Sequence, residues 1–480
     1  MAVLPQVAPR RLWVNSAAIF GGEAASRLAT LLMAIVIAHH FGATALGQYG
    51  YALALTSILL LIPDFGLHLY MVRELSADRA RLRAVFWNVH WLKFILVGAV
   101  LLFSLWFGLW GEKDSGRRVL FCILAGRALL QTFSQACMAV FKAYEEMHYV
   151  AWQQMLNTAL VAVWVAGSLA FHASLPVVVL GFIVGQAAET GMGWQIVRAR
   201  FWPGPPLKWK SAMIAATLAA AVPIGVTAIL QAVNLRVDML VLSHFAADGS
   251  LGQFQAAAWF PVGAFLAASL LMTVLFPKIT RLLQRDSPQA RDYVLSLLKN
   301  GVLVTSLGGL AVWLTAPYLL VTFFGRDAAP AIGTLRILAP MLPLMFLNTV
   351  LFYVFVAAGR RRVYLGTLAL GVAAGLILSV SLTSAYGPTG CAFADVARES
   401  IISASFLYFL AHETQTRTAG LAMAKVFTGS TMLAGAGLFL AMRTHMGEPW
   451  IAAWMILVFM GTLAALGLPR RPEMGAAYGR

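Results

Sequence analysis

Long apolar runs alternate with short polar segments along almost the whole chain. An α-helix needs about 20 mostly apolar residues to cross the hydrocarbon core of a membrane. The runs that reach this length lie at 13–38, 46–72, 85–110, 119–141, 148–171, 175–197, 211–245, 251–277, 293–324, 330–358, 362–385, 388–411, 423–442 and 450–468. The pattern therefore predicts an all-α integral membrane protein with about 14 transmembrane helices.

The composition agrees with this class. Hydrophobic residues make up 60% of the 480 residues, and only 11% are charged, whereas a soluble domain is roughly 25% charged. We expect no cleaved signal peptide, because the first apolar run is long enough to stay in the membrane. The three cysteines, Cys122, Cys137 and Cys391, lie inside apolar runs and form no CxxC pair. They are expected to be small buried residues rather than disulfide or metal ligands.

Basic residues are distributed unequally between the loops on the two sides of the membrane. Loops on one side, together with both termini, hold 23 Lys and Arg, and loops on the other side hold five. Cytoplasmic loops carry an excess of Lys and Arg, so both termini are predicted to be cytoplasmic. The net charge of +16 is then explained by topology and by attraction to anionic lipid, and no nucleic-acid partner is expected.

Charged residues also occur inside the predicted spans. The cations are Arg27, Lys93, Arg127, Arg236, Lys299, Arg336 and Arg398, and the acids are Glu23, Asp64, Glu189, Asp238, Asp395 and Glu399. A cation at the bilayer centre costs about 3 kcal/mol, and seven such cations would together cost more than the usual net stability of a fold, about 5–15 kcal/mol. Most of them must therefore face protein or a water-filled interior. Lys93 and Lys299, near span ends, are expected to extend to the interface.

Two groups of intramembrane charges have helical spacing. Glu23 and Arg27 are four residues apart and share a helix face, so they either line a cavity or form a pair that neutralises itself and holds helices together. Asp395, Arg398 and Glu399 also fall on one face, as a structural pair with one extra acid.

The other intramembrane arginines lack such a partner in sequence. Arg236 and Asp238 are two residues apart and cannot face each other on a helix. Arg127 heads a polar stripe on the fourth span, and Arg336 is the only charged residue in its span. Guanidinium groups bind phosphate through two hydrogen bonds and keep their charge when desolvated. Arginines in both halves of the chain therefore favour an anionic substrate that carries phosphate or pyrophosphate.

The chain contains an internal repeat of six spans. FGATALGQYGYALA (41–54) resembles FAADGSLGQFQAAAW (245–259), and VFKAYEEMHYV (140–150) resembles VFVAAGRRRVY (354–364). Six is an even number, so the two halves are predicted to share one orientation around a central cavity. The predicted divisions are an N-lobe at 1–200, a cytoplasmic linker at 201–210, a C-lobe at 211–412, and two further spans with a cytoplasmic tail at 413–480.

The sequence gives little support for an enzyme. DFG at 64–66 lies in an apolar span without an HRD-type loop, and no GxxxxGK[ST] run is present. The GxxxG runs Gly181–Gly185 and Gly371–Gly375 are expected to mark close helix packing within the protein. We therefore expect no catalytic residues and no bound metal or cofactor.

A resemblance to a known family rests on several runs in order. These are the first span with Arg27, GQYGYALA, PDFGL (63–67) followed by VRE (72–74), NLRVD (234–238), and YGPTGCAFADV (386–396). Together they resemble the polysaccharide transporter family of the multidrug/oligosaccharidyl-lipid/polysaccharide exporter superfamily. The likeness covers about 13–412, and nothing selects the related lipid II flippase branch.

The resemblance implies an O-antigen or exopolysaccharide flippase of the bacterial inner membrane. Such a protein moves an undecaprenyl-pyrophosphate-linked oligosaccharide to the periplasmic leaflet by alternating access between two six-helix lobes in a V shape. The expected partners are the lipid-linked substrate, membrane lipids, a polysaccharide polymerase and assembly proteins. The cavity cations of the family are carried over to Arg27, Arg127, Arg236, Arg336 and Arg398. Coupling to H⁺ or Na⁺ is expected, with Glu23, Asp64 or Asp238 as the carboxylate that binds the ion.

Two alternatives remain open at this point. The first is a multidrug and toxin exporter with the same fold, although intramembrane arginines would repel a purely cationic drug. The second is a non-transporting scaffold in a polysaccharide assembly complex.

Overall fold

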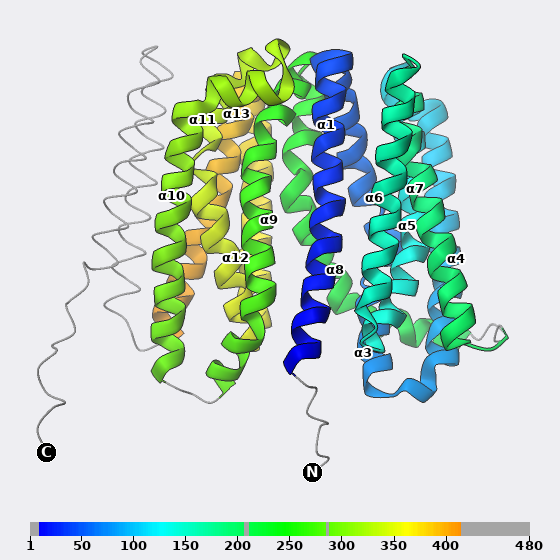
Figure 1. Cartoon of the computed structure of the whole chain (residues 1–480). Helices are drawn as coiled ribbons and strands as arrows, with labels where there is room; N and C mark the ends of the chain where they lie inside the picture. Colours follow the sequence, from blue (N-terminus) through cyan, green and yellow to red (C-terminus); the bar gives the residue numbers. More distant parts are fainter. Residues whose placement is uncertain (1–8, 206–210, 285–287, 414–480) are drawn as a thin grey trace, which may run out of the picture. The chain divides into compact units, whose positions relative to one another are not determined.

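The computed structural model describes residues 9–205, 211–284 and 288–413, and every regular element in these ranges is helical (Figure 1). The α-helices are α1 (Pro9–Leu59), α2 (Leu61–Asp64), α3 (Leu67–Ala77), α4 (Leu82–Trp106), α5 (Ser115–Ala143), α6 (Met147–Ala170), α7 (Leu175–Ile196), α8 (Ser211–Phe245), α9 (Asp248–Gln284), α10 (Pro288–Phe324), α11 (Ile332–Leu338), α12 (Met341–Ala357) and α13 (Arg361–Glu413). Short 3₁₀ and π segments are η1 (Arg79–Arg81), η2 (Phe107–Gly111), η3 (Val197–Phe201) and η4 (Arg326–Ala331). The predicted spans 423–442 and 450–468 lie outside the described residues.

The helices confirm a multi-pass membrane protein. Within the described ranges, eight helices are long and apolar enough to cross a membrane, or nine if the bent pair Arg326–Leu338 and Met341–Ala357 is one span. Two of the eight are 49 and 50 residues long, about twice the length that one crossing needs. Each contains a glycine with non-helical backbone angles, Gly42 and Gly387. Two helices therefore join at each of these glycines, and the total of 14 spans stays a prediction.

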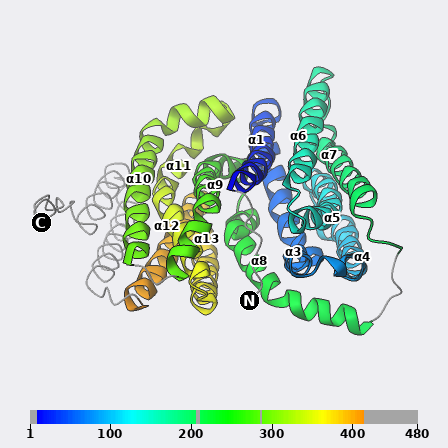
Figure 2. The same cartoon turned by 60° about the horizontal axis from the view of Figure 1, so that its bottom comes forward.

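The described chain forms two compact units. The first comprises residues up to Gln255 together with Phe323–Asp327, and the second comprises Ala256–Thr322 and the residues from Ala328 onward. In the first unit, α5 packs on α4, α6 and α7, and α1 packs on α5 and α6 (Figures 1 and 2). In the second unit, α13 packs on α11 and α12. Each unit has its own core of buried apolar side chains, and the predicted lobe boundaries stay a prediction.

The turns of the two repeats have matching backbone geometry. Glu145, between α5 and α6, has a positive φ of 65°, and Gly359, between α12 and α13, has a φ of 72°. These residues occupy the same place in the two aligned runs. A left-handed residue after a helix end satisfies the last carbonyl groups. Glu146 N–H donates to the Phe141 carbonyl oxygen, and Arg360 N–H donates to the Phe355 carbonyl oxygen, so α5 and α12 end in the same way.

Two predicted spans are interrupted in the structure. The run 46–72 is broken at Phe65 and Gly66, which both have left-handed backbone angles between α2 and α3. The run 330–358 is bent by 51° between α11 and α12, where Pro340 precedes the second helix. Proline removes a helical hydrogen bond, which is consistent with a bend at this position.

Both GxxxG runs pack closely, as predicted. A Cβ atom added at Gly185 would meet the side chains of Asn157 and Val161 on α6. A Cβ added at Gly371 or Gly375 would meet Ile402 or Arg398 in the other half of α13. These glycines therefore bring neighbouring helices into close contact within each unit.

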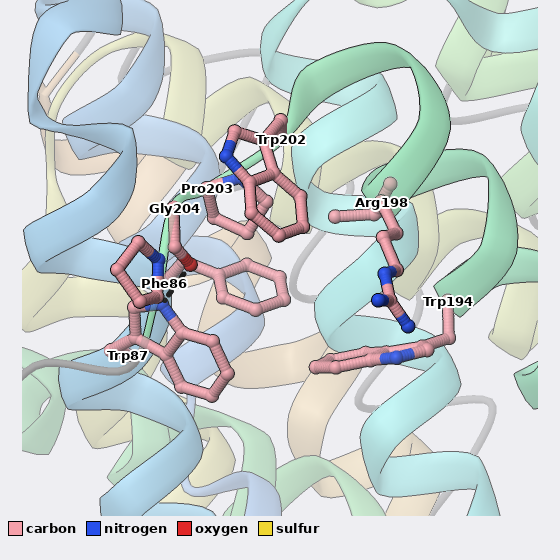
Figure 3. A pocket seen from close by; sticks show the side chains of 9 residues that line it. Phe86, Trp87, Trp194, Arg198, Trp202, Pro203 and Gly204 are labelled. Atoms are coloured by element: carbon pink, nitrogen blue, oxygen red, sulfur yellow. Dashed lines mark hydrogen bonds between the residues drawn. The ribbon is translucent and has the colours of Figure 1, made fainter.

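The beginning of the predicted linker is tied to the start of α4. Helix α7 passes into the π segment η3, and Trp202 then turns the chain with a left-handed φ of 31°. The indole Nε1 of Trp87 donates a hydrogen bond to the carbonyl oxygen of Gly204 at 3.1 Å (Figure 3). Arg83 Nε donates to the carbonyl oxygen of Pro205 at 3.2 Å. The predicted helix break is confirmed up to residue 205, and residues 206–210 lie outside the described ranges.

Candidate functional site

Arg127 lies in the interior of the first unit, on α5. Its guanidinium carbon is 4.6 Å from the ring centroid of Phe182 on α7. The aromatic face stabilises the cation electrostatically, by about 0.5–2 kcal/mol depending on desolvation. The buried Nε of Arg127 makes no hydrogen bond among the described residues. The predicted polar stripe on this span therefore presents a guanidinium with unused donor capacity.

Tyr49 brings a second arginine to the same place. Its side chain, from α1, is fully buried, and its ring stacks 6.4 Å from that of Phe182. Arg127 and Arg236 both lie within electrostatic range of the Tyr49 phenol. The hydroxyl has no hydrogen-bond partner in the described part of the chain. Two of the five predicted cavity arginines, from α5 and α8, are thus within electrostatic range of one buried hydroxyl.

An acid that the sequence analysis left without a role adjoins this group. Glu189 on α7 is buried, and its carboxylate accepts a hydrogen bond from the Ser134 hydroxyl at 2.6 Å and one from the Asn157 amide. Gln153 Nε2 donates to the main-chain oxygen of Glu189 at 2.9 Å. Arg127 lies within electrostatic range of this carboxylate. The only signal in the sequence was an acid inside an apolar span.

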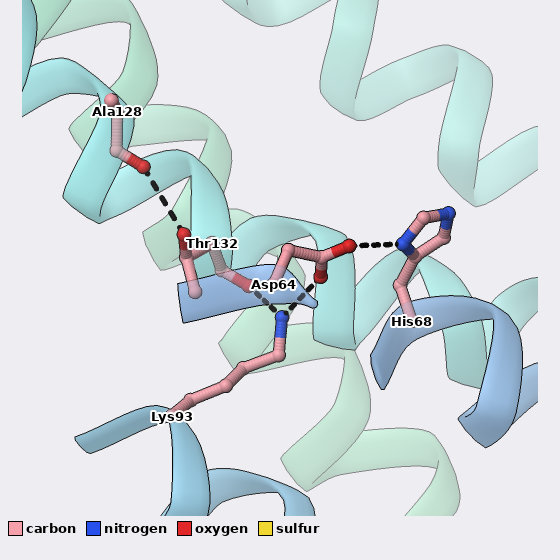
Figure 4. Close-up of polar contacts among 5 residues, drawn as sticks. All are labelled: Asp64, His68, Lys93, Ala128 and Thr132. Atoms are coloured by element: carbon pink, nitrogen blue, oxygen red, sulfur yellow. Dashed lines mark hydrogen bonds and ion pairs between the residues drawn. The ribbon is translucent and has the colours of Figure 1, made fainter. Parts of the chain in front are cut away.

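Asp64 occupies the break between α2 and α3. Lys93 Nζ donates hydrogen bonds to Asp64 Oδ1 and to the Thr132 carbonyl oxygen, both at 2.8 Å, and His68 Nδ1 lies 2.5 Å from Asp64 Oδ2 (Figure 4). Lys93 is fully buried, at 0% exposure. The expectation that Lys93 extends to the interface was therefore wrong, because the carboxylate of a broken helix offers it a partner in the interior. Asp64, which was predicted to bind a coupling ion, is paired with the ammonium group of Lys93.

The remaining predicted arginines of the described side chains lie in the second unit. Arg398 is 2% exposed, and its Nη1 forms an ion pair with Asp395 at 2.7 Å, while Nε is 3.7 Å from Glu399. Asn348 Nδ2 supports the same Glu399 carboxylate at 2.8 Å. The predicted cluster therefore forms, and its arginine is enclosed by acids of its own helix. Arg336 lies with its guanidinium carbon 5.0 Å from the Trp313 ring centroid.

The other predicted site residues are less fully defined. Glu23 and Arg27 lie on α1, but their side chains fall outside the described part of the structure. Asp238 accepts a hydrogen bond from the backbone N–H of Met239 at 2.8 Å. Among the described residues, no three His, Cys, Asp or Glu side chains gather in a way that would hold a metal ion.

The matching LGQ motifs of the two repeats pack on each other within the first unit. A Cβ added at Gly47 would overlap the carbonyl oxygen of Asp248, and one added at Gly252 would overlap that of Ala43. The contact is reciprocal, because Gly47 matches Gly252 and Ala43 matches Asp248 in the aligned repeats. Only glycine permits two helices to approach so closely.

Polar contacts surround this glycine crossing. Arg117 Nε donates to Asp248 Oδ1 at 2.7 Å, so a residue of the first repeat pairs with one of the second. Gln48 Nε2 donates to Asp114 Oδ1 at 3.3 Å, and Gln253, its equivalent, donates to the main-chain oxygen of Asp327 at 3.2 Å. Arg117 is one of the five basic residues that the sequence analysis counts in the loops of the less basic side, and its partner was not anticipated there.

Comparisons with known proteins place this geometry in context. The family model for polysaccharide biosynthesis proteins matches residues 12–283, which is more than half of the chain. A search of curated proteins gave no significant match.

Solved structures share the fold. A lipid II flippase MurJ in an inward closed conformation is similar over 92% of this chain and 96% of its own, with a TM-score of 0.70 and 14% identity. An inward-facing multidrug resistance MATE family transporter of the MOP superfamily is similar over 82% of this chain and 96% of its own, with a TM-score of 0.68 and 13% identity. The Vibrio cholerae MATE transporter VcmN in the bent form is similar over 87% and 98%, with a TM-score of 0.57 and 17% identity.

Proposed function

This chain belongs to the polysaccharide biosynthesis protein family, and from that premise we propose that it is a flippase for a lipid-linked oligosaccharide. The proposed substrate is an undecaprenyl-pyrophosphate-linked repeat unit of O-antigen or exopolysaccharide. The protein would work in the bacterial inner membrane with both termini in the cytoplasm. A polysaccharide polymerase would then use the unit on the periplasmic side.

The observation that carries the proposal is the buried guanidinium of Arg127 against Phe182, on which Tyr49 stacks, with Arg236 in electrostatic range of the Tyr49 phenol. A pyrophosphate that leaves water must exchange its hydration shell for charged donors. Arg127 Nε and the Tyr49 hydroxyl have unused capacity for hydrogen bonds, and Arg236 adds a second positive charge in range of the same hydroxyl. The proposed role of this group is to bind the pyrophosphate while the prenyl chain stays in lipid. Arg27 of the first unit and Arg336 of the second unit are proposed as further substrate-binding residues.

Arg398 differs from the other arginines in how its charge is compensated. Its charge is already compensated by Asp395 and Glu399 at the distances given above, and it is almost fully buried. Releasing it to bind substrate would leave two buried carboxylates without a cation, which costs about 3–5 kcal/mol. We therefore propose that Arg398 binds substrate only if that cluster rearranges during transport.

Alternating access needs a place where the repeats turn against each other. The Gly47–Gly252 crossing is a suitable pivot. Glycine has no side-chain carbon, so two helices that cross at glycines can rotate against each other without displacing core side chains. The Arg117–Asp248 ion pair beside it would hold the non-cytoplasmic ends together and would separate when the site opens to the periplasm.

Coupling to H⁺ or Na⁺ is proposed at Glu23, Asp64 or Asp238. For Asp64 the structure defines what this requires: a proton on the carboxylate would release Lys93, its buried partner at 2.8 Å. A buried ammonium without its carboxylate is costly, so protonation of Asp64 would drive a rearrangement of α2 and α4.

The multidrug alternative is disfavoured by the buried arginines, because the two that lie within electrostatic range of Tyr49 would repel an organic cation.

The proposal is tested in cells that lack the protein. We expect loss of surface polysaccharide and accumulation of lipid-linked oligosaccharide, measured by mass spectrometry of the lipid extract, with restoration by the intact gene. Normal surface polymer without accumulation would contradict the proposal. Increased uptake of a cationic dye in the same cells would instead favour the multidrug exporter.

A further inference from the structure

A pocket of about 220 Å³ lies in the first unit, and neither Arg127 nor Arg236 is among the residues that line it (Figure 3). Two segments that are far apart in sequence form it: the start of α4, and the end of α7 with η3 and the residues that follow. Its lining is Phe86, Trp87, Trp194, Val197, Arg198, Trp202, Pro203, Gly204 and Pro205. The proposed transport function uses none of these residues.

The walls of the pocket are aromatic. Phe86 is fully buried, whereas Trp194 and Trp202 are 38% and 58% exposed. Phe86 packs on Trp87 and Trp194 with ring centroids 5.5 and 5.6 Å apart. Indole rings with one exposed side favour the interface between membrane and water. The pocket thus offers apolar, ring-lined walls that open at the surface of the unit.

The pocket carries positive charge. Arg198 is exposed, and its guanidinium points toward Trp194 in Figure 3, with its central carbon 5.9 Å from the Trp202 ring centroid. No acidic residue is among the described residues that line the pocket. Arg83, also exposed, adds a second guanidinium next to it through its hydrogen bond to the Pro205 carbonyl oxygen. This charge is complementary to an anion.

The polar groups of the pocket restrict the kind of anion. The carbonyl oxygens of Gly204 and Pro205 already accept hydrogen bonds from Trp87 and Arg83. A sugar ring would bury several hydroxyls with few remaining partners, and a buried hydroxyl without a hydrogen bond is costly. A ligand with one phosphate group and an apolar body suits the lining better.

The position along the chain indicates the source of such a ligand. The segments before α4 and after α7 are the basic loops VRELSADRARLR and RARFWPGPPLKWK, which the distribution of Lys and Arg assigns to the cytoplasmic side. The cytoplasmic leaflet is rich in anionic lipid, and basic pockets between transmembrane helices on that side bind lipid head groups. We propose that this pocket binds the head group of an anionic phospholipid of the surrounding membrane.

In this complex, Arg198 binds the phosphodiester, and the indoles of Trp194 and Trp202 cover the glycerol and the first methylene groups. The bound lipid fills the gap between α4 and the residues after η3, and thereby fixes the point where the linker leaves the first unit. Binding is a reversible association and involves no covalent step.

The test is native mass spectrometry of the purified full chain with added phosphatidylglycerol or phosphatidylcholine. We expect the wild type to retain phosphatidylglycerol about tenfold more strongly, as one charge-assisted guanidinium–phosphate contact would provide. Arg198→Gln should abolish this preference. The matched control Arg200→Gln changes an exposed arginine that does not line the pocket, and it should keep the preference.

Three results would overturn the proposal. The first is equal retention of the two lipids by the wild type, and the second is an unchanged preference for phosphatidylglycerol in Arg198→Gln. The third is that the wild type retains a soluble prenyl-pyrophosphoryl disaccharide more strongly than phosphatidylglycerol, and that Arg198→Gln weakens this retention. Thermal unfolding of both variants in the same detergent checks that they are folded. The exposed position of Arg198 predicts no loss of stability.

Discussion

Single residues show three ways of placing a charge inside a membrane protein. Lys93 is paired with one acid, Arg398 is enclosed by two acids, and Arg127 lies against an aromatic ring. The first two arrangements compensate the charge within the protein. The third leaves the Nε donor of Arg127 unused, and this difference is the reason for assigning substrate binding to Arg127.

Tyr49→Phe should separate stability from transport. The variant removes a buried hydroxyl that has no partner among the described residues, so we expect the thermal midpoint of unfolding in detergent to stay the same or to rise. Transport of the lipid-linked substrate should fall, because the proposed hydrogen bond to pyrophosphate is lost. Reduced stability together with normal transport would show that the hydroxyl is structural.

Lys93→Met should be among the most destabilising single changes in the first unit. It leaves the Asp64 carboxylate buried with only His68 as partner, and breaking a buried pair costs about 3–5 kcal/mol. The double variant Lys93→Met with Asp64→Asn should recover much of this loss. Thermal unfolding of the two single variants and the double variant measures the coupling. Additive losses would contradict a direct pair.

The sequence predicted part of this residue-level picture. It identified the buried cations and the Asp395–Arg398–Glu399 cluster, because charges within apolar runs and at helical spacing can be read from the sequence alone. It failed for Lys93, whose partner is 29 residues away on another helix. It gave Glu189 no role and did not single out Tyr49, because their partners come from helices that only tertiary packing brings together.

At the scale of helices, the two repeats share the same kinds of turn and helix contact. Left-handed turns recur at Glu145 and Gly359, and the LGQ motifs cross with reciprocal contacts at Gly47 and Gly252. The helices themselves follow from apolar length, so their existence was predictable. The breaks at 60–66 and 339–340 were not predicted, because each depends on local backbone angles within an otherwise apolar run.

Gly252→Ala should weaken the crossing. The added methyl group would overlap the carbonyl oxygen of Ala43, which is backbone and cannot move aside alone. We expect a loss of about 1–3 kcal/mol of stability. Gly98→Ala on α4 is the control, since a Cβ there meets nothing within 4 Å, and it should be neutral or stabilising by up to about 1 kcal/mol. Equal midpoints for the two variants would contradict the close contact.

At the scale of the whole molecule, the proposed alternating access requires the polar contacts at the crossing to open. Cysteines at Arg117 and Asp248, in a chain without Cys122, Cys137 and Cys391, can be joined by a short reagent that reacts with two thiols. We expect cross-linking to stop transport and cleavage of the cross-link to restore it. Transport at the normal rate by fully cross-linked protein would show that these ends stay together throughout the cycle.

The central claim is that guanidiniums inside the first unit carry a pyrophosphate-linked sugar across the membrane. The most direct measurement is flipping of a fluorescent prenyl-pyrophosphoryl disaccharide in proteoliposomes that contain the wild type, Arg127→Ala, Arg127→Lys or the exposed control Arg361→Ala. We predict rapid flipping by the wild type and the control, a rate about 10- to 100-fold lower for Arg127→Ala from the loss of charge-assisted hydrogen bonds, and partial recovery with lysine. Equal rates in Arg127→Ala and the wild type, or no flipping by the wild type, would contradict the account.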